Sequence, residues 1–197
     1  MLQLYALEGF LERLANSPHA SRWVLKGGVL LAAYDVRRPT RDIDLQGRRI
    51  SGAASAVLHQ IREIASREEQ DGLTFDVNAA TVETIRDGDE DDYTGSRVTL
   101  RCRLASAKIV FHVDVSVGDP IWPAPKNVYV PRLLGGGLTL FGYPLAMVHA
   151  EKIVTAVQRG TFDEVLAADM AFADPAIEGQ VEGRTWSPVE RRWRSAG

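Results

Sequence analysis

The chain reads LKGGVLLAAY over residues 25–34 and TRDIDL over residues 40–45. Two glycines precede a short apolar segment typical of a helix, and a strand-like segment with two aspartates follows. Side chains alternate between the two faces of a strand, so Asp42 and Asp44 share one face while the apolar residues share the other. Two carboxylates on one face repel each other unless a cation lies between them, and oxygen ligands at this spacing suit Mg²⁺. The segment therefore predicts a metal site.

The glycine pair, Gly27 and Gly28, predicts a phosphate-binding turn. Glycine lets the backbone approach a ligand closely, and the helix after it directs free N–H groups and its positive dipole end there. Each half of the pattern has an alternative, since a glycine pair can form a plain turn and alternating acids can form a solvated strand face. The order of glycines, short helix, loop and acidic strand favours a nucleotidyl-transfer site.

A second strand-like segment, residues 108–117, adds a carboxylate. Its alternation places His112, Asp114 and Ser116 on one face and apolar residues on the other. Three acids from two neighbouring strands suit a two-ion site for Mg²⁺, with Mn²⁺ as the alternative metal. Two other interpretations stay open: Asp114 as an ordinary paired strand acid, and His112 as a hydrogen-bonded neighbour of the site.

Four segments together resemble a known family: residues 26–28, 40–45, 112–120 and 143–152. They are similar to the signature of the AbiEii/MenT nucleotidyltransferase toxins, members of the polymerase-β-like nucleotidyltransferase superfamily. The resemblance implies an α/β (α+β) fold with a mixed sheet flanked by helices and a short C-terminal helical region. Together with the proline- and glycine-rich segment 121–137, it predicts a catalytic domain over residues 1–130 and an abbreviated helical region over residues 138–197.

The resemblance also implies an activity. These toxins transfer a nucleoside monophosphate, a pyrimidine in several cases, from a nucleoside triphosphate to the 3′ end of tRNA, and each has an antitoxin partner. Carried onto this chain, the resemblance assigns metal binding to Asp42, Asp44 and Asp114, and phosphate binding to Gly27 and Gly28. It assigns triphosphate contact to Lys152, and nucleotide or acceptor contacts to Lys26 and Arg41.

Two other functions are compatible with the same residues. One keeps the fold and transfers the nucleotide to a protein or a small molecule, and the other is a catalytically inactive module that binds nucleoside triphosphate. A regulatory hypothesis concerns Thr40, because its phosphorylation would place about −2 charge beside the metal cluster. Asp169 is a further candidate, in the place of an aspartate that related toxins carry.

The composition is that of an ordinary globular protein. With 197 residues, 45% of them hydrophobic and 25% charged, the chain fits one or two small domains. Its net charge of −3 does not indicate nucleic-acid binding, although Arg37, Arg38 and Arg41 form a local basic cluster. The single cysteine, Cys102, is expected to be a small strand residue. No segment resembles a membrane span or a signal peptide, so a cytoplasmic location is expected.

The remaining secondary structure follows from periodicity and from glycine and proline positions. Helices are predicted over residues 2–16, 29–34, 53–68 and 145–158, and strands over residues 73–85 and 98–104. Residues 23–25 are expected to lead into the glycine turn, and the acidic run 87–92 to form a solvated loop. The segments 121–137 and 174–197 are predicted to be irregular.

Overall fold

The computed structural model describes residues 1–35, 40–86, 94–159, 184–187 and 192–195. The chain divides into two compact units, Met1–Val148 and His149–Gly197. The first unit contains both segments that decided the fold prediction. The basic residues Arg37 and Arg38, the acidic run 87–92 and Asp169 lie outside the described residues.

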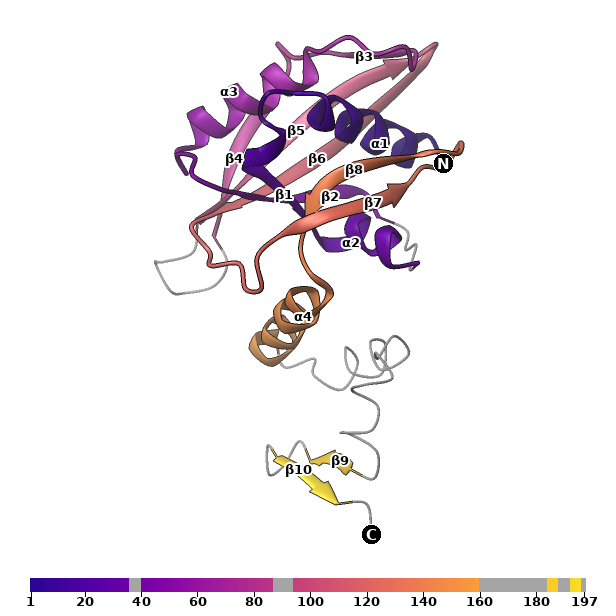
Figure 1. The fold of residues 1–197 in the computed structure, drawn as a ribbon. Helices are drawn as coiled ribbons and strands as arrows, with labels where there is room; N and C mark the ends of the chain where they lie inside the picture. The colour runs from indigo at the N-terminus through magenta and orange to yellow at the C-terminus, as the bar shows by residue number, and fades with distance from the viewer. Residues whose placement is uncertain (36–39, 87–93, 160–183, 188–191, 196–197) are drawn as a thin grey trace. The chain divides into compact units, whose positions relative to one another are not determined.

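The first unit is built on an eight-stranded mixed sheet (Figure 1). Across the sheet the order is β3-β5-β6-β2-β1-β8-β7, and β4 also pairs with β5. Strand β2 runs parallel to β6 and β1 runs parallel to β8, whereas the other pairs are antiparallel. The mixed sheet predicted for this fold is confirmed. The strands in chain order are β1 (Trp23–Lys26), β2 (Asp42–Gly47), β3 (Leu73–Phe75), β4 (Thr81–Arg86), β5 (Thr94–Leu104), β6 (Ala107–Val117), β7 (Lys126–Pro131) and β8 (Gly137–Gly142).

Helices α1 (Leu2–Ala15) and α3 (Ala54–Ala65) cover one face of this sheet (Figure 1). The ring centroid of Phe10 on α1 lies 6.2 Å from that of Phe111 on β6 and 6.5 Å from that of Phe75. Because side chains alternate along β6, Phe111 faces these helices while His112 and Asp114 face the other way. The polar face of β6 is therefore the face that α1 and α3 leave uncovered.

An ion pair between Arg13 of α1 and Asp71 is buried beside this core, with side-chain exposures of 2% and 5%. Arg13 also donates to the backbone oxygens of Arg67 at 2.8 Å and Gly9 at 2.9 Å, and its guanidinium lies 4.7 Å from the ring centroid of Phe75. Burial alone raises the pKa of Asp71, but the hydrogen bonds and charge of Arg13 lower it below its ordinary value. The pair ties the end of α3 and the start of β3 to α1.

Several predicted boundaries are corrected by the structure. The predicted strand 73–85 is two strands, because residues 76–80 form a turn in which Asp76 accepts a hydrogen bond from the Ala79 N–H at 3.1 Å. Residues 23–25 belong to β1, and the predicted helix 29–34 begins at Gly27 as α2 (Gly27–Leu30) and continues as the 3-10 helix η2 (Leu31–Tyr34). The segment predicted to be irregular, 121–137, contains β7, whose alternating Val128 and Val130 are buried.

The predicted domain boundary between residues 130 and 138 falls inside the β7–β8 pair. Strand β8 continues into the sheet through its pairing with β1, and the Tyr143 N–H donates to the backbone oxygen of Leu25 at 3.0 Å. Hydrogen bonding to the central strands therefore keeps residues 137–143 in the first unit, which ends at Val148.

Helix α4 (Leu145–Arg159) confirms the predicted helix over residues 145–158 and extends into the second unit. The tail predicted to be irregular contains an antiparallel pair of strands, β9 (Arg184–Ser187) and β10 (Arg192–Ser195). Their tryptophan and threonine residues are typical of strands. The C-terminal region is thus not purely helical.

Candidate active site

Strands β2 and β6 bring three carboxylates to one face of the sheet. In their parallel pairing Asp44 lies opposite Asp114, and Asp42 lies opposite His112. All four side chains are partly buried, whereas Ile43, between the two aspartates, is completely buried on the opposite face. The structure therefore collects the three carboxylates that the sequence predicts as metal ligands.

Two of these carboxylates are paired with side chains. Arg97 on β5 donates from Nε and Nη2 to the two oxygens of Asp114, each at 2.7 Å, and these bonds raise the pKa of Arg97 above its ordinary value. Nδ1 of His112 lies 3.0 Å from Oδ1 of Asp42. Both interpretations left open by the sequence therefore occur, since Asp114 is in an ion pair and His112 is hydrogen-bonded. Sequence reasoning missed Arg97, because only the β5–β6 register places it opposite Asp114.

Asp44 is the most perturbed carboxylate of the cluster. Burial, followed by the charge of Asp114, raises its pKa to about 6, and the charge of Asp42 adds to this rise. Lys26 and a hydrogen bond from the Gly28 N–H act in the opposite direction. A carboxylate held near other negative charges in this way is a recognised mark of a functional site.

The glycine pair, Gly27 and Gly28, lies against the carboxylate of Asp44. Gly27 has φ +65°, and a Cβ built there would overlap the carboxylate of Asp44. The Gly28 N–H that the sequence assigns to a phosphate donates instead to Asp44 in this structure. The glycines therefore allow the backbone to approach the carboxylate cluster closely.

Replacing Gly27 with alanine should destabilise the protein by about 1–3 kcal/mol through the left-handed backbone alone, and should also displace Asp44. Urea unfolding and Mg²⁺-dependent binding of nucleoside triphosphate measure the two effects. Gly136 is a matched control, because its φ is +70° and a Cβ there would meet nothing within 4 Å. If Gly136→Ala weakens triphosphate binding as much as Gly27→Ala does, the overlap with Asp44 is not the cause.

Lys26 lies opposite Asp44 across the antiparallel β1–β2 pair. Its charge lowers the pKa of Asp44 and of Asp119, although burial raises the pKa of Asp119 overall. The Lys26 ammonium lies 5.9 Å from the ring centroid of Tyr143. The predicted nucleotide-contacting lysine is thus placed at the carboxylate cluster.

A buried glutamine, Gln46, extends the polar face beyond the carboxylates. With its amide nitrogen toward Ser116, it donates to Ser116 Oγ at 2.6 Å and to Asp119 Oδ2 at 3.1 Å, and it accepts from the Asp119 N–H at 3.2 Å. Its side chain is 1% exposed. Sequence reasoning missed Gln46 and Asp119 as parts of the site, although Gln46 continues the alternation of Asp42 and Asp44.

Comparison with known families identifies this arrangement. The family model described as "Nucleotidyl transferase AbiEii toxin, Type IV TA system" matches residues 9–164, which include all of the sheet and the carboxylate cluster. The chain belongs to the AbiEii nucleotidyltransferase family.

Two solved structures resemble this AbiEii chain. JHP933 from Helicobacter pylori aligns with a TM-score of 0.49 and 13% identity, over 77% of this chain and 55% of that one. A second H. pylori protein, described as a nucleotidyltransferase, aligns with a TM-score of 0.47 and 15% identity, over 78% of this chain and 59% of that one. The chain therefore spans less than two thirds of either protein. A comparison with curated protein sequences gives no match.

The donor set of the AbiEii site suits a divalent cation, because its carboxylate oxygens are hard ligands and the negative charges of Asp114 and Asp42 raise the pKa of Asp44. Within the described part of the chain, however, no three Asp, Glu, His or Cys side chains are arranged to bind one ion together. Arg97 holds both oxygens of Asp114, so a second ion at Asp114 requires the Arg97 guanidinium to move.

Three other predicted site residues of the AbiEii chain lie outside strands β2 and β6. Arg41 precedes β2 with its side chain exposed, and Thr40 Oγ1 donates to the backbone oxygen of Asp42 at 3.2 Å. Lys152 lies on the part of α4 that belongs to the second unit. No helix among the described residues is both long and apolar enough to cross a membrane.

Proposed function

We propose that this protein is a toxin that transfers a nucleoside monophosphate from a nucleoside triphosphate to the 3′ end of tRNA. A pyrimidine triphosphate is the proposed donor, as in several related toxins. The observation that supports this most strongly is the carboxylate cluster on the β2–β6 pair within an AbiEii chain. In this reaction the acceptor hydroxyl oxygen bonds to the α-phosphorus, the bond from that phosphorus to the bridging oxygen breaks, and pyrophosphate leaves. The proton of the hydroxyl passes to a carboxylate of the cluster.

Asp42, Asp44 and Asp114 are the proposed holders of Mg²⁺, or of Mn²⁺. When bound, the metal neutralises charge that develops on the phosphoryl oxygens. Lys26, opposite Asp44, lies where it can contact a phosphate oxygen, and Lys152 is proposed to bind the triphosphate. Arg97 limits access to Asp114 until substrate replaces the carboxylate as its anionic partner.

The test is to incubate wild type and Asp44→Ala with total tRNA, Mg²⁺ and each labelled nucleoside triphosphate in turn, and to resolve the products on a denaturing gel. Label in tRNA with wild type alone supports the reaction, the acceptor and the nucleotide together. Unlabelled tRNA with an adduct on protein detected by mass spectrometry would refute the tRNA acceptor. Triphosphate binding without turnover on any acceptor would refute transfer.

Phosphorylation of Thr40 is proposed to inactivate this site. The Thr40 hydroxyl donates to the backbone oxygen of Asp42, and it lies so close to Gly28 that a Cβ built on that glycine would be 3.0 Å from Oγ1. A phosphate on Thr40 would therefore lie next to both Asp42 and the glycine turn. A phosphomimetic Thr40→Glu should lower transfer at least about tenfold by repulsion of the triphosphate. Thr40→Val removes the hydroxyl without adding charge and should retain activity within about threefold. Steady-state kinetics of both variants measure this, and full activity of Thr40→Glu would contradict it.

A further inference from the structure

A pocket of about 420 Å³ opens at the ends of the two carboxylate-bearing strands. It lies between the chain that follows β2, at Arg48 and Arg49, and the chain that follows β6, at residues 118–125. Gly47 and Val117, which are paired across β2 and β6, also line it. Each lies three residues beyond Asp44 or Asp114, so the pocket begins about 10 Å from the carboxylates at the rise of a strand.

The positive charge of this pocket is available to a ligand. Neither Arg48 nor Arg49 has a side-chain hydrogen bond or ion pair with the described residues, and Arg49 is exposed. The Arg48 N–H donates to the backbone oxygen of Arg22 at 2.8 Å, which places a third, exposed arginine next to them. Guanidinium groups suit phosphate oxygens because they donate two parallel hydrogen bonds.

An exposed aromatic residue lies next to this pocket in the chain. Trp122 is 83% exposed and directly follows Ile121, which lines the pocket. Flat aromatic side chains beside arginines are the stacking platforms of proteins that bind single strands. The combination fits a ligand that alternates bases with phosphates.

Asp119 also lines the pocket, and its hydrogen bonds with Gln46 connect it to the carboxylate face. A carboxylate repels phosphate but accepts hydrogen bonds from sugar hydroxyls. The 2′-hydroxyl is the group by which a protein distinguishes RNA from DNA at a given site. A carboxylate in the lining of the pocket, as Asp119 provides, therefore favours RNA over DNA.

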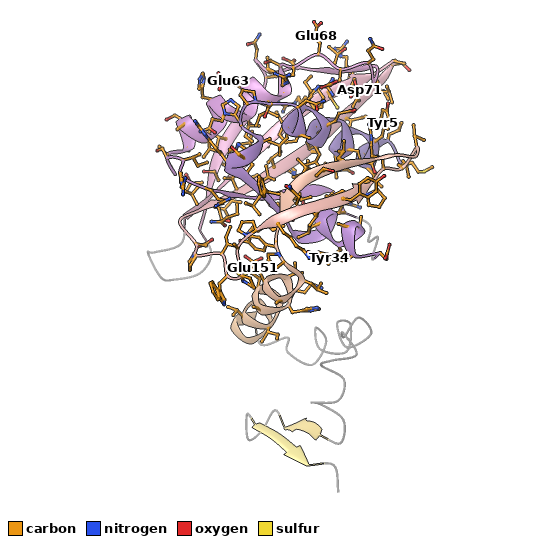
Figure 2. The ribbon with its side chains drawn as sticks, in the orientation of Figure 1. Tyr5, Tyr34, Glu63, Glu68, Asp71 and Glu151 are labelled. Atoms are coloured by element: carbon orange, nitrogen blue, oxygen red, sulfur yellow. The ribbon has the colours of Figure 1, made fainter. Side chains whose placement is uncertain are left out.

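The larger pocket of the first unit does not suit such a ligand. It has a volume of about 810 Å³ and is lined by five acidic residues: Glu8, Glu12, Glu68, Glu69 and Asp71. Figure 2 shows Tyr5, Glu68 and Asp71 together at one end of the first unit, away from Tyr34. A polyanion would be repelled there.

We infer that the pocket lined by Arg48, Arg49 and Asp119, together with Trp122 next to its lining residue Ile121, binds the single-stranded 3′ end of the RNA acceptor; this surface is here called the Arg48–Trp122 groove. This inference rests on the proposed function, which supplies the RNA. The arginines contact phosphates, Trp122 stacks on a base, and Asp119 accepts a ribose hydroxyl, so that the terminal hydroxyl reaches the carboxylates.

Fluorescence polarisation of a labelled single-stranded RNA of about 12 nucleotides, without nucleoside triphosphate, tests the groove. Trp122→Ala should weaken binding about 5- to 100-fold, while Trp122→Phe retains it. Arg48→Ala/Arg49→Ala should weaken binding and reduce the slope of log K against log salt by about 1.4, since each phosphate contact on a single strand contributes about 0.7. Trp122→Ala should leave that slope unchanged.

Two matched controls lie outside the groove. Tyr129→Ala removes another exposed aromatic side chain, and Arg103→Ala removes another exposed arginine. Both should bind the RNA like wild type. Equal losses in the groove variants and in these controls would overturn the inference, as would equal affinity for DNA of the same sequence.

The kinetics of transfer separate this inference from the proposed function. Groove variants should raise KM for tRNA and leave KM for the nucleoside triphosphate unchanged, and the reverse result would assign the groove to the nucleotide base and overturn the inference. If wild type labels tRNA and the groove variants behave like wild type, only the inference fails. If wild type binds RNA through the groove but labels no tRNA, only the proposed reaction fails.

Discussion

Replacing Asp44 with asparagine is expected to abolish transfer while making the protein more stable at neutral pH. Burial and the charges of Asp114 and Asp42 raise the pKa of Asp44 to about 6, so the folded state binds this proton more tightly than the unfolded state does. The contribution of Asp44 to stability is therefore fully present below its ordinary pKa of 3.8 and is lost as the pH rises through about 6. Asparagine keeps the shape and cannot ionise.

The gain in the free energy of unfolding should grow from near zero at pH 4 to on the order of 3 kcal/mol at pH 8, measured by urea unfolding in the presence of a chelator. Transfer should fall by at least about 10³-fold, because a proposed metal ligand is lost. Added Mg²⁺ should raise the Tm of wild type and not that of Asp44→Asn. The control Asp76→Asn changes an exposed turn aspartate and should show none of these effects. A gain independent of pH would contradict the charge explanation.

Replacing Arg13 with alanine is expected to change stability in the opposite direction from Asp44→Asn. Arg13 lies outside the carboxylate cluster, and its replacement should cause a large loss of stability. Its partner Asp71 would remain as a buried charge, and the backbone oxygens of Arg67 and Gly9 would lose their donor. Breaking a buried ion pair by removing one partner typically costs about 3–5 kcal/mol. Urea unfolding at pH 7 measures this loss.

The double variant Arg13→Ala/Asp71→Ala should be less destabilised than Arg13→Ala, because it removes the unpaired charge as well. The pKa of Asp71 is lowered in the folded wild type, so the pair stabilises above the ordinary pKa of 3.8 and this stability is lost as the pH falls through the folded pKa. Arg13→Ala should lack that acid-dependent loss. Arg132→Ala breaks a more exposed pair with Glu12 and should cost about 1 kcal/mol or less. Equal losses in Arg13→Ala and Arg132→Ala would contradict the role of burial.

Strand alternation has a period of two, so spacing alone places Asp42 and Asp44 on one face of their strand and assigns Asp114 to one face of its own strand. Spacing does not show that the two strands are neighbours; the family resemblance supported that part of the prediction. The helices over residues 2–16 and 145–158 could also be predicted from the sequence, because their apolar residues recur at helical spacing.

The partners of the carboxylates could not be predicted in the same way. Arg97 meets Asp114 only through the register of β5 against β6, and nothing local distinguishes it from Arg101 or Arg103 on the same strand. The role of Gly28 also depends on tertiary structure, since its N–H donates to a carboxylate that is 16 positions later in the chain. Short sequence motifs do not show which residues far apart in the chain will contact each other.

The parallel pairing of β2 with β6 also determines when activity can arise during synthesis. The bond between His112 and Asp42 spans 70 residues, so the three carboxylates cannot meet until β6 has left the ribosome. At about 5–20 residues per second, this interval lasts roughly 4–14 s. A nascent chain that carries only β1, β2 and α3 therefore holds the two aspartates of TRDIDL without their third partner, and the carboxylate cluster is incomplete throughout that interval.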